Sequence, residues 1–352
     1  MGNQPVPRAG LDWIMTRRIF LRASGACLAG LTAGPLVLRA FGEPRPNTAR
    51  FGIITDLHYA NRQYSTRYCS ESLDKLNECV ELMNKQEVNF LIELGDFKDQ
   101  DEPPVEANTI TYVQAAEAVL QRFTGSTYHV LGNHDMDSIS KAQFLTNVEN
   151  TGIASDASYY SFELNGLHFV VLDANFSSNG TAYDHGNFTW TDAIIPSAEL
   201  DWLKQDLAFA NGPVIVFTHQ LLDGTGSYYV GNAAAVRQIL EASGKVMAVF
   251  QGHHHAGAYN LLRGIHYYTL KAVVEGSGAQ NNAYAIVEVH PDRSITVSAY
   301  RKAVRKEFPA RCSVADLNGD CVVDFQDCAI MAEEWLSAGV VEPGPSPRPR
   351  GR

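Results

Sequence analysis

The chain has 352 residues, of which 45% are hydrophobic and 19% are charged, and its 39 acidic against 28 basic residues give a formal charge of −11. This apolar content can form a sizeable core, and the low charged fraction excludes a chain that is disordered throughout. The acidic balance argues against a nucleic-acid polymer as a partner, because backbone phosphates are bound by clustered Lys and Arg. A small phosphate ester stays open as a ligand, since a bound metal ion can reverse the charge locally.

Residues 1–42 have the features of an export signal. The paired Arg17 and Arg18 precede an apolar stretch over 23–38, which is too short and too rich in glycine to be a stable transmembrane anchor. The segment from Thr16 to Arg22 resembles a twin-arginine signal peptide. The resemblance implies export by that route, with metal already loaded, to the periplasm, the cell surface or the medium.

Residues 43–308 alternate apolar runs with amphipathic stretches, which predicts an α/β domain. In such a domain ligands bind at the carboxyl ends of the strands. Strands are predicted over 51–55, 90–94, 128–131, 168–172, 214–218, 246–250, 266–270 and 283–289, and helices over 70–84, 111–122, 197–209 and 233–242.

Five of these predicted strands end in polar residues. They run into Asp56-Leu57-His58, Gly95-Asp96, Gly132-Asn133-His134-Asp135, His219 and Gly252-His253-His254-His255. Any one of these residues alone could be a helix cap or a buried structural histidine. The tetrapeptide Gly-Asn-His-Asp alone arises by chance in such a chain on the order of once in several hundred. The set therefore predicts one shared site.

The residue types favour a metal site. Carboxylate, imidazole and amide oxygen suit divalent first-row metals, and the absence of thiolate argues against structural zinc. Asp56 and His58 are predicted to project to one side of a strand, because side chains alternate with period two. The same spacing predicts that His253 and His255 face one side and His254 the other.

The order of these motifs resembles that of the calcineurin-like metallophosphoesterases over residues 51–300. The resemblance implies a four-layer αββα sandwich of two mixed sheets with flanking helices. Seven ligand side chains make eight bonds only if one carboxylate bridges, and Asp96, alone on its strand, is the predicted bridge. The implied ligands are Asp56, His58, Asp96 and His255 for metal site 1, and Asp96, Asn133, His219 and His253 for metal site 2.

The predicted function is that of an exported dinuclear-metal phosphohydrolase. It would cleave phosphodiester or pyrophosphate bonds by in-line attack of a metal-bridging hydroxide. His134 is the predicted proton donor to the leaving oxygen, and Asp135 the residue that orients its imidazole. A cyclic-nucleotide phosphodiesterase or a phosphomonoesterase is the alternative within the family. An inactive secreted adhesion or scaffold protein is a second class, disfavoured because all seven ligands are present.

Finer features bear on metal and substrate. Asp99 occupies the position at which purple acid phosphatases carry a ferric tyrosine ligand, which favours two divalent ions, manganese or iron, with zinc as an alternative. The segments 51–59, 67–73 and 264–275 resemble the manganese-dependent ADP-ribose/CDP-alcohol diphosphatases, although His58 stands where that group often has Gln. Small phosphate esters or nucleotides are therefore the expected substrates. The candidates for stacking a base are Tyr59, Tyr228, Tyr229 and Tyr259.

Residues 309–337 contain a loop that resembles a dockerin-type calcium loop, a relative of the EF-hand, ahead of a helix predicted over 328–336. The implied ligands of one calcium ion are Asp316, Asn318, Asp320, Val322 through its carbonyl, Asp324 and Asp327. Because Cys321 replaces the usual Gly and only one loop is present, docking to a cohesin-like partner is not favoured. Cys312 and Cys321 are the predicted disulfide, and residues 338–352 a disordered tail.

Overall fold

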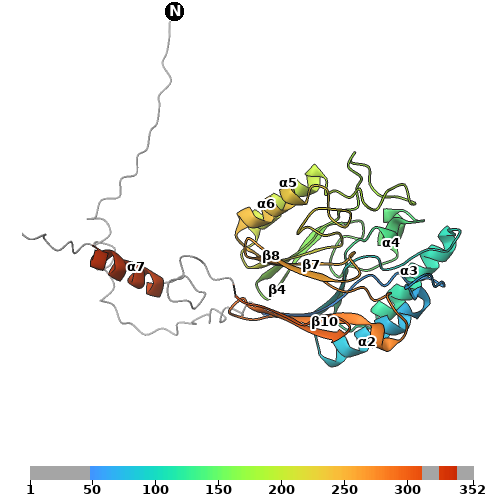
Figure 1. The fold of residues 1–352 in the computed structure, drawn as a ribbon, viewed down its shortest axis with the longest axis horizontal. Coiled ribbons are helices and arrows are strands. Elements are labelled where there is room, and N and C mark those ends of the chain that lie inside the picture. The colour runs from blue at the N-terminus through green and yellow to red at the C-terminus, as the bar shows by residue number, and fades with distance from the viewer. Residues whose placement is uncertain (1–47, 311–324, 339–352) are drawn as a thin grey trace, which may run out of the picture. The chain divides into compact units, whose positions relative to one another are not determined.

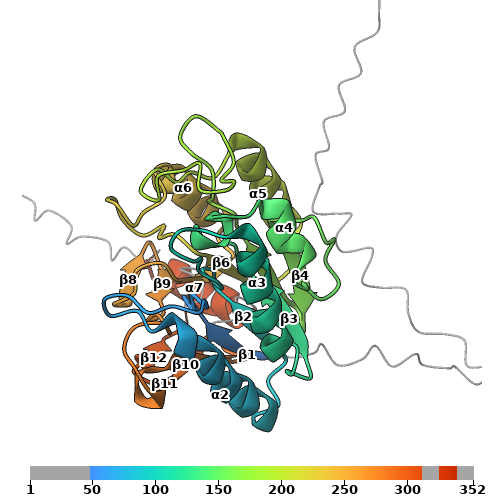
Figure 2. The same cartoon turned by 90° about the vertical axis from the view of Figure 1, so that its right-hand side faces the viewer.

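The structure is a computed structural model that describes residues 48–310 and 325–338 (Figures 1 and 2). The predicted export signal, the Cys312–Cys321 disulfide, most of the tail and five of the six calcium-loop residues lie outside the described residues. Those five are Asp316, Asn318, Asp320, Val322 and Asp324. Among the described residues, no helix combines the length and apolarity that a membrane span requires.

Two mixed sheets of six strands each form the centre of residues 48–310. The first has the order β12 (Lys306–Phe308), β11 (Ile295–Arg301), β10 (Ala283–Val289), β1 (Ala49–Ile54), β2 (Phe90–Glu93) and β3 (Ser126–His129). The second has the order β4 (Tyr160–Leu164), β5 (Leu167–Val171), β6 (Val214–Thr218), β7 (Val246–Gln251), β9 (Ile265–Thr269) and β8 (Ala258–Leu262).

Parallel strands bring their carboxyl ends to the same edge of each sheet. In the first sheet β1, β2 and β3 are parallel, with Phe51 opposite Phe90 and Leu91 opposite Thr127. In the second sheet β5, β6, β7 and β9 are parallel, and β4 and β8 run antiparallel at the edges. The loops after these parallel strands therefore meet on one side of the domain.

The sheets pack face to face through phenylalanine rings. Phe51 of β1 stacks on Phe90 of β2 with centroids 4.7 Å apart. It also meets Phe169, Phe217 and Phe250 of the second sheet edge-on at 5.7, 5.7 and 5.9 Å. Edge-to-face contacts between buried rings stabilise the pair beyond the area that they remove from water. The fully buried interface fixes how the two sets of strand ends face each other.

Helices cover the outer face of each sheet (Figures 1 and 2). α2 (Ser72–Lys85) and α3 (Glu106–Leu120) pack on the first sheet, and α5 (Ser197–Phe209) and α6 (Ala233–Ser243) on the second. The α2 residues Leu76, Val80 and Met83 are buried, at the spacing of one helical face. The remaining short helices are η1 (Cys69–Glu71), η2 (His134–Met136), α4 (Lys141–Thr146) and η3 (Ala279–Asn281). The predicted α/β fold of two mixed sheets is confirmed.

Some elements differ from the prediction. The strands β4, β8, β11 and β12 and the helix α4 were not predicted, and α3 begins five residues before the predicted start at 111. Described by itself, α7 (Phe325–Ala338) is longer than the predicted helix, and Asp327 in its first turn is buried. Cys69, Cys79 and Cys328 are free thiols.

Candidate metal centre

The loops that follow the parallel strands are joined by main-chain hydrogen bonds. Asp56 N donates to Gly95 O at 3.0 Å, and His58 N donates to Asp96 O at 2.8 Å. Within the second sheet, Gly252 N donates to His219 O at 3.1 Å, which joins the loop after β7 to the loop after β6. These bonds hold the polar residues of separate loops in fixed positions.

Four of the predicted ligands have left-handed backbone conformations. The φ angles of Asp56, His58, Asp96 and His253 are 53°, 47°, 58° and 64°, values that residues other than glycine adopt rarely and that cluster at functional sites. The prediction that Asp56 and His58 share one side of a strand is therefore wrong in its reasoning, because β1 ends at Ile54. The turns after the strand orient these two side chains.

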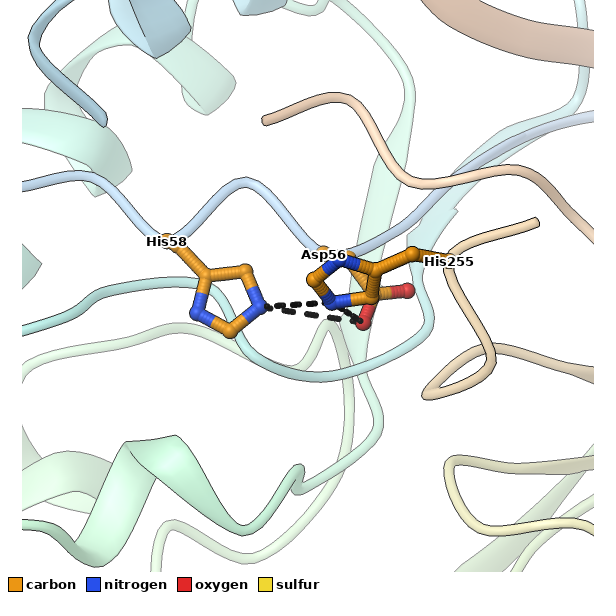
Figure 3. Close-up of side chains that lie close together, drawn as sticks. All are labelled: Asp56, His58 and His255. Carbon is orange, nitrogen blue, oxygen red and sulfur yellow. Dashed lines mark hydrogen bonds and ion pairs between the residues drawn. The ribbon is translucent and has the colours of Figure 1, made fainter. Parts of the chain in front are cut away.

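The first cluster contains Asp56, His58 and His255, whose side chains lie close together and point toward one another (Figure 3). The Nε2 atoms of the two imidazoles lie 3.2 Å apart. Asp56 Oδ1 lies 3.4 Å from His255 Nε2 and 3.8 Å from His58 Nε2. Burial raises the pKa of Asp56, but the neighbouring imidazoles of His255 and His58 outweigh burial and hold the pKa below its usual value. The carboxylate therefore stays ionised, as a metal ligand must.

The second cluster contains Asp96, His219 and His253, whose ligand atoms lie within 4.8 Å of one another. Asp96 Oδ2 is 3.1 Å from His219 Nε2 and 3.4 Å from His58 Nε2, so this one oxygen lies between the two clusters. Its partner Oδ1 accepts a hydrogen bond from His134 N at 2.8 Å. The structure thus places Asp96 where a bridging carboxylate would be.

Buried polar atoms without hydrogen-bond partners provide a test of the fit to metal ions. Such atoms occur elsewhere in the described residues too, but four of them belong to predicted ligands and are directed at the site: Asp56 Oδ1, Asn133 Oδ1, His219 Nε2 and His253 Nε2. Leaving such atoms unpaired costs about 1–3 kcal/mol each, whereas a bound cation would satisfy them. Since they are the oxygen and nitrogen donors that divalent first-row metals prefer, the residues fit a pair of such ions.

Two glycines permit the close approach of these loops. A Cβ atom on Gly132 would lie 2.1 Å from Asp96 N, and one on Gly252 would lie 2.2 Å from Thr55 Oγ1. Any side chain at either position would push the loops apart. The glycines in the motifs Gly-Asn-His-Asp and Gly-His-His-His are therefore required by packing rather than by flexibility.

His134 lies beside the first cluster and faces the cavity described below. Its ring centroid is 4.6 Å from that of His58, and its Nδ1 is 2.6 Å from Asp137 Oδ2. Burial lowers the pKa of His134, but the carboxylates of Asp137 and Asp96 outweigh this and raise the pKa to about 9. The three-residue spacing from His134 to Asp137, one turn of η2, was the available signal for this pair, and sequence reasoning missed it.

The predicted role of Asp135 is wrong. Its buried carboxylate accepts hydrogen bonds from Gly132 N at 2.8 Å, Phe97 N at 2.9 Å and Asp96 N at 3.1 Å. Because its two oxygens are occupied by main-chain amides, it joins the loops after β2 and β3 and does not orient the imidazole of His134. Burial and the charge of Asp96 raise the pKa of Asp135 to about 6.

A cavity of about 450 Å³ opens over both clusters. Trp190 and Tyr228, with ring centroids 5.5 Å apart, form an aromatic wall on the side of His253. Arg67 and Glu275 lie at the side of His255. Among the residues that line it are Asp96, Asn133, His134, His253 and His255.

Some of the other residues singled out in the sequence line the cavity, and others lie away from it. His254 belongs to neither cluster, but it lines the cavity 4.7 Å from Tyr228, so it does not face away from the site. Of the four predicted stacking tyrosines, Tyr228 is a lining residue, whereas Tyr259 packs on Phe308 at 5.6 Å. Trp190 was missed, since no motif surrounds it in the sequence.

A family model of calcineurin-like phosphoesterases matches residues 49–257. The chain belongs to the calcineurin-like phosphoesterase family. Together with the two clusters and the relatives described next, this membership identifies it as a metal-dependent hydrolase that acts on phosphate ester bonds.

Two similar proteins support the same class of function. A manganese-dependent ADP-ribose/CDP-alcohol diphosphatase of Oryza sativa subsp. japonica is 28% identical over 298 residues, which cover 72% of this phosphoesterase and 92% of the relative. A protein of Fibrobacter succinogenes named "Probable cyclic nucleotide phosphodiesterase" is 23% identical over 238 residues, which cover 62% of this chain and 77% of the relative.

Solved structures share the fold. A dimetal phosphatase from Danio rerio has a TM-score of 0.66 at 20% identity, covering 76% of this chain and 100% of that one. A purple acid phosphatase from yellow lupin, Lupinus luteus, has a TM-score of 0.54 at 11% identity, and the match covers 75% of this chain and 53% of the lupin chain. At these identities the likeness supports the architecture and not a particular substrate.

Proposed function

We propose that this phosphoesterase hydrolyses a phosphodiester or pyrophosphate bond in a small nucleotide-type molecule and that manganese is its preferred metal. The observation that carries the proposal is the cavity itself. Buried, unpaired ligand atoms of two clusters lie beneath it, and an aromatic wall forms one of its sides. Phosphate is bound where cations concentrate positive charge, and a flat base stacks on exposed aromatic rings.

Each group has a role in this proposal. The ligands would be Asp56, His58, Asp96 and His255 for one ion, and Asp96, Asn133, His219 and His253 for the other. When bound, a pair of divalent ions lowers the pKa of a water molecule and compensates the charge that develops on the phosphoryl oxygens. His134 would donate its proton to the leaving oxygen, while Asp137 holds the imidazole in place. Arg67 would bind oxygens of a neighbouring phosphate.

A cyclic-nucleotide diester is the second candidate, favoured by the similarity to the Fibrobacter protein. The two candidates separate in one panel of the purified chain with Mn²⁺, assayed on ADP-ribose, CDP-glycerol, cyclic AMP, bis-p-nitrophenyl phosphate and p-nitrophenyl phosphate. We expect the highest kcat/KM on ADP-ribose or CDP-glycerol. A preference for cyclic AMP would support the second candidate, and a preference for p-nitrophenyl phosphate would contradict both.

The aromatic wall gives a sharper test of the substrate class. Trp190→Ala should raise KM for ADP-ribose about 5- to 150-fold, since stacking on one base contributes roughly 1–3 kcal/mol. Trp190→Phe retains an aromatic ring and serves as the matched control. Glycerophosphocholine, a diester without a flat ring, should show no such loss. Equal losses on both substrates would mean that Trp190 supports the loop and does not bind a base.

We further propose that residues 1–42 direct export by the twin-arginine route and that residues 309–337 bind one calcium ion. Paired arginines ahead of an apolar stretch support the first proposal, and five oxygen ligands at the spacing of a calcium loop support the second. N-terminal sequencing of the exported protein should begin near residues 41–43 rather than at Met1. EGTA should increase protease cleavage within 309–337 and leave the catalytic domain intact.

A further inference from the structure

The two histidines of the first cluster are flanked by carboxylates on their outer sides. Each directs its Nε2 at the cluster and its Nδ1 away from it. His255 Nδ1 is hydrogen-bonded to Glu275 Oε1 at 2.6 Å, and His58 Nδ1 lies 3.5 Å from Asp99 Oδ2, which is an ion-pair contact without a hydrogen bond. Carboxylates in this position fix the orientation of a ligand imidazole and raise its basicity.

Two further side chains connect these carboxylates. Tyr64 Oη donates to Asp99 Oδ2 at 2.9 Å, and Arg67 Nη1 donates to Tyr64 Oη at 2.7 Å. Arg67 Nε lies 4.0 Å from Glu275 Oε1. We call Asp99, Tyr64, Arg67 and Glu275 the outer arc, since they form one continuous series of polar contacts from His58 to His255.

Main-chain pairing holds the outer arc in register. Tyr68 N donates to Val274 O at 2.9 Å, and Gly276 N donates to Thr66 O at 2.9 Å, on either side of the bridge between Arg67 and Glu275. The segment that carries Tyr64 and Arg67 is thus bonded to the segment that carries Glu275. The arc is pre-organised by the fold, so its carboxylates do not depend on a ligand to reach the histidines.

The second cluster is built differently. His219 Nδ1 pairs with the main-chain carbonyl of Leu94 at 2.8 Å, and the ring of His253 packs edge-on against Trp190 and Tyr228. The inner ligands also differ in charge. Asp96 would be a ligand of both ions, but the first ion would also be bound by the carboxylate of Asp56, whereas the second would be bound by the neutral amide of Asn133.

We propose that Asp99 and Glu275 are positioning residues that make the first cluster the tighter of the two metal sites. The first ion would then remain bound while the second exchanges with the medium. The carboxylate of the ligand Asp56 and the carboxylates of Asp99 and Glu275 next to the ligand histidines all favour a dication at the first cluster. A main-chain carbonyl and aromatic neighbours supply less negative charge at the second. The proposal concerns metal binding alone and goes beyond the proposed substrate.

Titration of the metal-free full chain with Mn²⁺, followed by calorimetry and by the electron paramagnetic resonance signal of free Mn²⁺, tests the proposal without any substrate. We expect two classes of site that differ at least 10-fold in Kd. Glu275→Gln and Asp99→Asn should each weaken the tight class about 10- to 100-fold, the range for outer-shell partners of metal ligands. Asn133→Ala should weaken the other class alone.

Control variants show whether a change in metal affinity comes from the positioning of the ligands or from a loss of folding stability. Glu71→Gln removes a carboxylate that bonds the neighbouring residues Ser277 and Gly278 but contacts no predicted ligand, so both Kd values should be unchanged. Tyr64→Phe cuts the arc at its centre and should weaken the tight class less than Glu275→Gln does. Each variant is compared with the parent by thermal unfolding of the metal-free protein. Two equal classes in the parent would overturn the proposal, as would a Glu275→Gln variant with parental affinity.

Discussion

The two clusters show two ways of fixing a ligand histidine. In the first, side-chain carboxylates of Asp99 and Glu275 stand behind the imidazoles. In the second, the carbonyl of Leu94, the residue directly after β2, stands behind His219. A main-chain acceptor is present whenever the strand forms, whereas a carboxylate can be removed by one substitution. His58 and His255 can therefore be tuned by substituting the carboxylates next to them, whereas the main-chain partner of His219 cannot be removed by a substitution.

Substituting the residue that the clusters share should have the largest effect. Asp96→Asn replaces the carboxylate between the clusters with a neutral amide, so we expect the amount of bound Mn²⁺ to fall. We expect kcat/KM to drop on the order of 10³-fold, because a pair of bound metal ions stabilises the charge of the transition state by several kcal/mol. Metal analysis and steady-state kinetics measure the two losses. A variant that kept both ions and its activity would show that the clusters do not share this oxygen.

Removing His134 should separate chemistry from metal binding. His134→Ala leaves the predicted ligands of both clusters in place but removes the proposed proton donor, so we expect kcat to fall about 10²-fold with bound Mn²⁺ unchanged. Activity on a substrate with a more acidic leaving group should fall less, since that group needs less help from a proton donor. Loss of metal and activity together would contradict the assigned role.

The neighbouring aspartates give a matched pair of smaller effects. Asp135→Asn should lower the free energy of unfolding by about 1–3 kcal/mol. The amide has one acceptor oxygen where the carboxylate has two, so buried main-chain N–H groups would lose a hydrogen-bond acceptor. Asp137→Asn should lower kcat, and its effect on the free energy of unfolding should be smaller than that of Asp135→Asn, because Asp137 contacts the partly exposed ring of His134 and Asp135 contacts buried main-chain N–H groups. The free energy of unfolding and kcat are measured for both variants. Equal destabilisation by the two substitutions would contradict this separation of roles.

His168 offers the smallest and most specific test, because it lies between two carboxylates and belongs to neither cluster. Its ring nitrogens are 2.6 Å from Glu163 and 2.6 Å from Asp206. Burial lowers its pKa, but these hydrogen bonds outweigh burial and raise the pKa above 6.5. The resulting stabilisation is complete below the unfolded pKa and is lost as pH rises through the folded pKa.

The measurement for His168 is the Tm of the parent and of His168→Gln from pH 6 to pH 9. We expect the parent to be the more stable at pH 6 and the difference to shrink towards pH 9. A difference that stayed constant across this range would show that His168 contributes through packing and not through its charge.

The fold was predictable where residues are buried on both sides. Val214–Thr218 and Ala283–Val289 have the predicted bounds because nearly every residue in them is buried and apolar. The strand β8 was missed because it lies at a sheet edge with mostly exposed or partly exposed residues. Edge strands and the polar first turn of α3 leave no apolar period to detect.

The candidate metal ligands could be predicted from the sequence, but the residues that position them could not. Strand-end motifs predict that Asp56, Asp96 and His219 meet, because parallel strands share an edge. Asp137 and Glu275 act through contacts that depend on loop geometry, and no periodicity encodes them. The same limitation explains the error at Asp135, whose carboxylate reaches main-chain amides of another loop.

The left-handed turns at Asp56, His58, Asp96 and His253 have a consequence for protein design. Copying these side chains onto the ends of straight strands would scatter their donor atoms, since each points inward only after the chain has turned. A transplanted centre must first reproduce the shape of its loops, and Asn, which tolerates that shape, is the natural placeholder while the scaffold is being built.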